Sequence, residues 1–389
     1  MNAVRLRTAF GAGCLSLAIV GSASAGGFAR GSADTDILFE DGNFAMRAGV
    51  TYVSPNRKIS SSANPALVGT NYTSDYAIPS AAFMIKPIDA FRCAGTLVQA
   101  FGGSGDYAAP KPPTGKKSEE FTVDELGLTC AVKFSAGYGN AYILGGAFQE
   151  TFNYGRVNDF SILGLPAGTT ANLQLKGEDT GYRIGAAYEI PEIAFRTQLM
   201  YRSGTSYGAE GTLRGPAGIF APGLPVPPLT QIAIPVLGYG NLPQSVELKL
   251  QSGIAPGWLA FGSVKWSDWS VQKSLDVRVK ANGALISQDT YNWKDGWTVT
   301  GGIGHAFNEN VSGALSLTWD QGVATGWDLS SDTYTVAAGG VLKDKFGGEL
   351  RGGVGVTYLS SAQETKNLFN TSVDSGWAFA VNLGYKVNW

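Results

Sequence analysis

The chain has 389 residues, of which 15% are charged, and its formal net charge is -2. A charge so close to neutral argues against nucleic-acid binding as its main task. The length would suffice for two ordinary domains, but no composition break or charged linker divides the sequence, so we expect one domain after a short leader.

Residues 1–25 have the pattern of a secretory signal peptide. Two arginines precede an apolar run over residues 9–20, and an Ala-Ser-Ala cleavage motif ends at Ala25. The apolar run is too short to span a bilayer, so we expect cleavage after Ala25 rather than an uncleaved membrane anchor.

Residues 26–43, GGFARGSADTDILFEDGN, are too polar and irregular to cross a membrane. They precede the first expected strand. The barrel inferred below has a lumen too wide for wall side chains alone to fill. We therefore expect a short N-terminal plug, or hatch, in the lumen, and a disordered periplasmic tail is the alternative.

Residues 44–389 predict an all-β fold, a transmembrane antiparallel β-barrel of about fourteen strands. No apolar run in this part approaches a transmembrane helix, and only helices and closed barrels satisfy every backbone group in lipid. The expected strands are 44–58, 76–87, 91–103, 119–135, 140–157, 173–190, 193–213, 236–253, 257–276, 289–307, 311–322, 331–343, 346–360 and 376–389.

The connections between these strands alternate in length. Short turns lie at one end of each strand pair, and long Pro- or Gly-rich loops lie at the other. The long loops are 59–75, 104–118, 158–172, 214–235, 277–288, 323–330 and 361–375. Outer-membrane barrels have this asymmetry, with short periplasmic turns and longer external loops, whereas a soluble β-sandwich has no need of it.

The last strand carries the clearest sidedness. From Trp377 to Trp389 one parity is entirely apolar, and the other is small or polar and includes Lys386. This is typical of the closing strand of a Gram-negative outer-membrane barrel. We therefore expect a monomer in the cell outer membrane, in contact with lipid and lipopolysaccharide and recognised by the barrel-assembly machinery through this strand.

Two cysteines follow the leader, Cys93 and Cys130. The expected strands make them neighbours with the same outward parity. In an oxidising compartment such a pair can form a disulfide, and two free buried thiols are the alternative.

Two neighbouring external loops are unusually apolar. The loop 214–235 also contains five prolines between its start and Pro228, which would keep it stiff and lower the ordering cost of binding. Exposed apolar clusters commonly mark ligand surfaces, so we expect a capture groove, although the loops could simply fold over the barrel mouth. The candidate residues are Phe160, Ile162, Leu163, Leu165, Ile219, Phe220, Leu224 and Val226.

Three glycines, Gly102, Gly103 and Gly105, lie near the end of the expected third strand. Glycines inside a strand mark bulges, bends or close backbone approach. A kink here would interrupt pairing and open the wall sideways, and an ordinary strand end is the alternative.

The sequence contains no grouping typical of catalysis. His305 is the only histidine, and no motif supplies it with a nucleophile and an orienting group. No metal-binding or cofactor-binding motif is present either. We therefore expect neither an enzyme nor a cofactor.

Three stretches resemble the FadL/TodX family of outer-membrane transporters: residues 44–60, 175–203 and 242–270, the last with its Leu-Pro entry and Trp-x-x-Trp. The resemblance implies fourteen strands, an N-terminal hatch, a capture groove on the third and fourth external loops, and a kinked third strand with lateral exit. It also implies passive uptake of hydrophobic compounds, most of all long-chain fatty acids, with aromatic hydrocarbons as the other class. It assigns ligand contact to Phe28, and it suggests that Arg156 holds a carboxylate.

Other functions fit parts of the same pattern. A general diffusion porin for small polar solutes is the main alternative, and the apolar loops and the plug oppose it. A barrel enzyme would need more than His305. An adhesin or receptor that uses the external loops is the remaining class.

Overall fold

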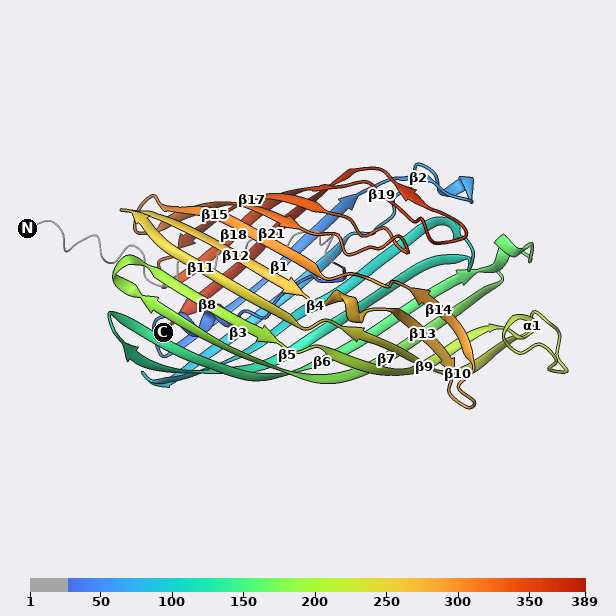
Figure 1. Cartoon of the computed structure of the whole chain (residues 1–389), viewed down its shortest axis with the longest axis horizontal. Coiled ribbons are helices and arrows are strands. Elements are labelled where there is room, and N and C mark those ends of the chain that lie inside the picture. The colour runs from blue at the N-terminus through green and yellow to red at the C-terminus, as the bar shows by residue number, and fades with distance from the viewer. Residues whose placement is uncertain (1–26) are drawn as a thin grey trace, which may run out of the picture.

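The computed structural model describes residues 27–389, so the expected signal peptide, 1–25, lies outside the described residues. Eighteen strands form one closed antiparallel sheet, and β1 (Phe44–Asn56) pairs with β21 (Gly376–Asn388) to complete the barrel. Four spanning segments are each interrupted once, so the eighteen strands make a fourteen-stranded barrel (Figure 1). The expected fold class is confirmed.

The uninterrupted spanning strands between β1 and β21 are β3 (Tyr76–Ile88), β4 (Phe91–Lys111), β5 (Lys116–Ala136), β6 (Gly139–Asp159), β7 (Thr170–Ile190), β16 (Val311–Asp320), β17 (Thr333–Lys343) and β18 (Gly348–Leu359). The interrupted ones are β8 (Phe195–Arg202) with β9 (Thr205–Pro216), β10 (Gln231–Leu242) with β11 (Ser245–Ala255), β12 (Trp258–Ser267) with β13 (Ser274–Val279), and β14 (Leu285–Thr290) with β15 (Gly296–Ala306).

Short elements complete the fold. They are η2 (Thr35–Phe39), β2 (Ile59–Ser61), η3 (Pro65–Leu67), η4 (Phe160–Leu163), η5 (Pro191–Ile193), α1 (Ala217–Phe220), η6 (Trp269–Val271), β19 (Ala362–Gln363) and β20 (Ser372–Val373). Within residues 27–389, no helix is long and apolar enough to span a bilayer.

Side chains alternate between lipid and lumen as the sequence pattern predicts. In β21, Phe379 and Val381 are 57% and 55% exposed on the outer face, whereas Lys386 is 2% exposed on the inner face. Outward aromatic residues gather towards both ends of the spanning region, as in interfacial girdles. Those towards the external end are Tyr52, Tyr182, Tyr201, Trp266, Trp297, Trp319, Tyr334, Tyr358 and Trp377.

The four interruptions lie on one line across the barrel wall. Arg202 pairs with Ser245, Ser245 with Ser267, and Ser267 with Gly296, and each of these residues ends or begins its strand at the interruption. Beyond the line the upper segments pair again with one another, β9 with β10, β10 with β13 and β13 with β14.

The predicted length of the external loop 104–118 is wrong. β4 continues to Lys111 and β5 begins at Lys116, so only four residues connect them. The loops after β6 and β13 are shortened in the same way. Strands were expected only where one parity is apolar, but here the strands extend beyond the apolar belt, where outward residues such as Glu120 and Thr122 are polar.

The two cysteines lie opposite each other on β4 and β5. Cys93 pairs in register with Cys130, and the structure joins them by a disulfide. Both cysteines are half-buried on the outer face of the barrel.

Candidate functional site

A cavity of about 380 Å³ lies inside the barrel on the external side of the N-terminal segment. Aromatic rings make its apolar floor. The ring of Phe28 lies 4.4 Å from Phe121, 4.6 Å from Trp293 and 5.4 Å from Tyr291, measured between centroids. Phe28, to which the family resemblance assigned ligand contact, therefore lines the cavity. The sequence pattern did not identify the other three aromatic residues as part of a binding site.

External segments that were expected only as loops complete the cavity walls. Trp327 and Phe369 line it from the connections before β17 and β21. Asp328 also faces it and accepts a hydrogen bond of 2.6 Å from Trp293 Nε1. Burial raises the pKa of Asp328 to about 6, in spite of this hydrogen bond.

The barrel wall is split beside this cavity. β3 and β4 pair from Ile88–Phe91 up to Ser80–Val98, and beyond that point β3 pairs only with β1. β4 has a register shift against β5 between Gln99 and Phe101, which leaves Ala100 as an extra residue. A bulge of this kind bends a strand and ends regular pairing.

The split begins within the apolar outer belt. Beyond it, Pro79 and Ala77 of β3 are exposed on the outer face. Ala77 pairs with Tyr52, which belongs to the external aromatic girdle. The split therefore faces the outer leaflet of the membrane.

The N-terminal segment fills the split from inside. Ala29 forms an isolated antiparallel bridge with Phe101. The amide of Arg30 donates to the carbonyl of Ala100 at 2.9 Å, and the amide of Gly102 donates to the carbonyl of Phe28 at 2.8 Å. This segment thus supplies β4 with backbone hydrogen bonds that β3 no longer provides, as a strand at membrane depth requires.

The glycines of β4 make room for this segment. A Cβ on Gly102 would lie 2.7 Å from Cζ of Arg30, and one on Gly103 would lie 2.8 Å from Cε1 of Phe121. Gly105 is less crowded, with Tyr107 Oη at 3.1 Å. The proposed kink is thus accompanied by a bulge at Ala100, and Gly102 and Gly103 are needed for space.

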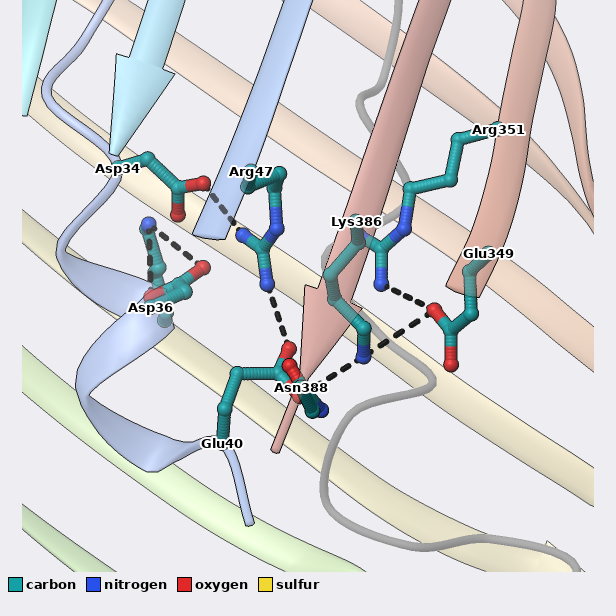
Figure 2. A network of polar contacts seen from close by, with 9 residues as sticks. Asp34, Asp36, Glu40, Arg47, Glu349, Arg351, Lys386 and Asn388 are labelled. Carbon is teal, nitrogen blue, oxygen red and sulfur yellow. Dashed lines mark hydrogen bonds and ion pairs between the residues drawn. The ribbon is translucent and has the colours of Figure 1, made fainter. Parts of the chain in front are cut away.

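The periplasmic part of the same segment is held by charge. Figure 2 shows Arg47 of β1 between Asp34 and Glu40, with which it forms ion pairs. Glu40 also pairs with Lys386 at 2.8 Å. Asp36, one turn earlier, pairs with Lys249 at 3.2 Å.

Apolar packing supports the same region. Ile37, Leu38 and Phe39 of η2 are buried in one cluster with apolar residues of β1, β3, β4, β5, β6 and β7. The guanidinium of Arg196 also lies 4.4 Å from the centre of the Phe39 ring. The segment 33–40 is therefore fixed to the wall by both charge and burial.

The two apolar loops contribute unequally. Phe160 and Phe220 meet at 5.9 Å between ring centroids, and Leu165 and Ile219 pack against the same apolar core. The remaining candidates lie nearer the surface, with Ile162 half-buried and Leu163, Leu224 and Val226 exposed. None of the eight lines the cavity of about 380 Å³, so the structure brings four of them together in the apolar core and leaves the other four outside it.

Arg156 lies behind the cavity wall rather than on its surface. Its two terminal nitrogens donate to Asp289 and Ser287, both at 2.8 Å. The side chain is only 6% exposed. Both nitrogens that would hold a carboxylate are therefore engaged within the protein.

Comparison with known proteins places this arrangement in a family. Residues 37–312 match the family described as outer membrane protein transport protein (OMPP1/FadL/TodX). A long-chain fatty acid transport protein of Salmonella typhi is 24% identical over 217 residues, which cover 53% of this chain and 49% of that protein. The chain thus spans about half the length of this curated relative.

Solved structures agree in fold. A Pseudomonas aeruginosa FadL homologue has a TM-score of 0.74 at 12% identity, with 91% of this chain and 92% of that chain covered. The P. putida toluene transporter TodX has a TM-score of 0.65 at 12% identity, with 95% and 97% covered. Proteins of this family are channels without enzymatic activity in the outer membrane of Gram-negative bacteria. Because the family match covers most of its length, the chain belongs to the OMPP1/FadL/TodX family of outer-membrane transport proteins.

Proposed function

We propose that the chain is a channel for the passive uptake of hydrophobic solutes across the outer membrane, with long-chain fatty acids as its main substrates. In this scheme the external loops around Phe160 and Phe220 capture the solute. The solute then enters the cavity floored by Phe28 and leaves sideways between β3 and β4.

The observation that carries the proposal is the split in the wall above Ser80 and Val98. Exposing an apolar chain to water costs about 0.8 kcal/mol per methylene. Release of a chain of about sixteen methylenes into the periplasm would then cost about 13 kcal/mol. Exit through the split into the outer leaflet avoids that cost, so a lateral path suits a fatty acid.

Monoaromatic hydrocarbons are the second candidate class. The rings of Phe28, Phe121, Tyr291 and Trp293 would offer edges and faces to an aromatic solute. The similar proteins support both classes, because one is a long-chain fatty acid transport protein and another is a toluene transporter.

The lateral path is tested by deletion of Ala100. The deletion removes the extra residue of the bulge and leaves Phe101 onward in register with β5, so that β4 can pair with β3 beyond Val98. We expect uptake of radiolabelled oleate to fall to background in cells that lack their own fatty-acid transporter. Gly95→Ala is the control within the same strand, because a Cβ at Gly95 meets nothing within 4 Å.

The variants are compared only where both migrate as folded, heat-modifiable barrels. Unchanged oleate uptake by the folded deletion variant would refute lateral exit. If the wild-type protein in planar bilayers passed salts and small sugars freely and did not transport oleate, the chain would be a diffusion porin instead.

A further inference from the structure

Four cationic side chains line the cavity, and three of them are already saturated. Lys111 pairs with Glu364 at 2.8 Å, and Lys116 pairs with Glu119 at 2.7 Å. The third, Arg57, donates from all three guanidinium nitrogens to backbone carbonyls and to a serine hydroxyl.

Arg30 is the fourth, and it differs from the others. Like Arg57, it has no carboxylate within ion-pair distance of its guanidinium among residues 27–389, but unlike Arg57 its guanidinium is not filled with hydrogen bonds. Its only side-chain hydrogen bond in the described part of the chain runs from Nη1 to Oε1 of Gln99, at 2.5 Å. The neutral amide does not compensate the positive charge, and Glu120 acts on it only from beyond ion-pair distance. The other guanidinium nitrogens keep their donor capacity.

The position of this charge relates it to the split in the wall. The Arg30 guanidinium carbon lies 4.0 Å above the centre of the Tyr76 ring, on β3 beyond the split. Gln99 lies on the opposite side, at the bulge of β4. The guanidinium thus bridges the two edges of the opening, and it is close to Gly102, where a Cβ would collide with it.

An apolar surface lies beside the charge. Phe28 and Arg30 are two positions apart in the segment that pairs with β4, and both line the cavity. Successive side chains of an extended segment alternate, so residues two apart project to the same side. The plug therefore presents an aromatic ring and a free guanidinium together, which matches a molecule with an apolar body and an anionic head.

We infer that Arg30 binds the carboxylate of an amphipathic anion in the cavity, which makes carboxylate-bearing lipids the preferred substrates over neutral hydrocarbons. This inference rests on the proposed function and specifies its substrate class. A planar guanidinium offers paired N–H donors that match the two oxygens of a carboxylate. Arg156, with both terminal nitrogens engaged, does not offer this.

The test compares two probes that share one chain and differ in the head group. Oleate and oleyl alcohol are titrated against the protein in lipid nanodiscs, and dissociation constants are measured for the wild type and for Arg30→Met. We expect the variant to lose about 10- to 100-fold in oleate affinity, the range for a hydrogen-bonded charge, and to bind oleyl alcohol within about twofold of the wild type. Arg30→Lys, which keeps the charge but not the fork, should recover part of the oleate affinity.

The control removes a saturated cation together with its partner. In the double variant Lys280→Met with Glu210→Gln, oleate affinity should stay near the wild-type value, because that pair is already neutral and does not line the cavity. If Arg30→Met lost affinity equally for both probes, or lost no affinity for oleate, the inference would be overturned and the channel proposal would still stand. If the wild type bound neither probe, the proposed function itself would fail.

Discussion

Glu40 anchors the segment 33–40, the periplasmic half of the expected plug, and Glu40→Gln should release it. The carboxylate is 2% exposed and accepts hydrogen bonds from Arg47 at 2.5 Å, Lys386 at 2.8 Å and Asn388 at 3.2 Å. The amide of glutamine keeps the shape but has one acceptor oxygen, and its NH₂ group would face a cation.

The expected magnitude follows from the hydrogen bonds that the substitution removes. Two charge-assisted hydrogen bonds are worth roughly 1.5–3 kcal/mol each, and removal of one partner from a buried pair costs about 3–5 kcal/mol. We expect the substitution to destabilise the attached segment by about 3–5 kcal/mol in total, because Arg47 still pairs with Asp34 and Lys386 still pairs with Glu349. At about 1.4 kcal/mol per factor of ten, the detached state of segment 33–40 becomes roughly two to three and a half orders of magnitude more populated.

Hydrogen exchange in lipid nanodiscs measures this population directly. The protection factors of the amides in η2 should fall by the same two to three and a half orders of magnitude, while those of the barrel strands stay unchanged. Glu349→Gln is the matched control. Glu349 pairs with Lys386 and Arg351 in the same network, but within residues 27–389 it has no ion pair to the plug (Figure 2). If Glu40→Gln kept wild-type protection, or if the control lost as much, the ion pairs would not be what holds the plug.

Three further outcomes can be measured. Reduction of the Cys93–Cys130 disulfide, which closes a loop over a sequence separation of 37, should lower the free energy of unfolding in urea by at most about 4 kcal/mol. Gly103→Ala should lower the rate of oleate uptake severalfold, because the added methyl group would displace the aromatic floor. The pKa of Asp328 is raised to about 6, so protonated Asp328 stabilises the fold fully below about pH 4, and this contribution is lost as the pH rises through 6. Trp293, whose Nε1 donates to Asp328, should change its fluorescence with a midpoint near pH 6.

Each of these has its own control. A double Cys→Ala variant must not respond to reductant. Gly95→Ala should transport like the wild type, so equal loss in both glycine variants would point to general damage of β4. Asp328→Asn should abolish the fluorescence change near pH 6, and persistence of that change would assign it to another group.

The barrel could be predicted from the sequence because side chains that face lipid must be apolar. One apolar parity per strand, as in β21, is enough to define both faces, and the charge of Lys386 points inward as expected. The same rule misplaced the ends of β4 and β5, because strands that rise above the membrane no longer need an apolar side. Extended structure there is maintained by pairing between strands, which a single sequence does not display.

The site was readable only in part. Gly102 and Gly103 lie where the N-terminal segment meets β4, and the structure shows that they leave room for Arg30 and Phe121. Gly102 meets Arg30 from a distant part of the chain, which the sequence pattern could not show. The family resemblance suggested that Arg156 holds a ligand carboxylate, yet it pairs with Asp289, 133 positions away. Nothing in the sequence identified Arg30 as a binding residue, because a single arginine in a polar segment cannot be distinguished from one exposed to solvent.

The line of interruptions from Arg202 to Gly296 has a mechanical consequence. Hydrogen-bond ladders stiffen the wall of a β-barrel, and here three neighbouring ladders stop at the same level. The barrel wall therefore bends most easily along this line of interruptions. The outer rim that carries β9, β10, β13 and β14 can widen or narrow while the bilayer-embedded cylinder below keeps its circumference.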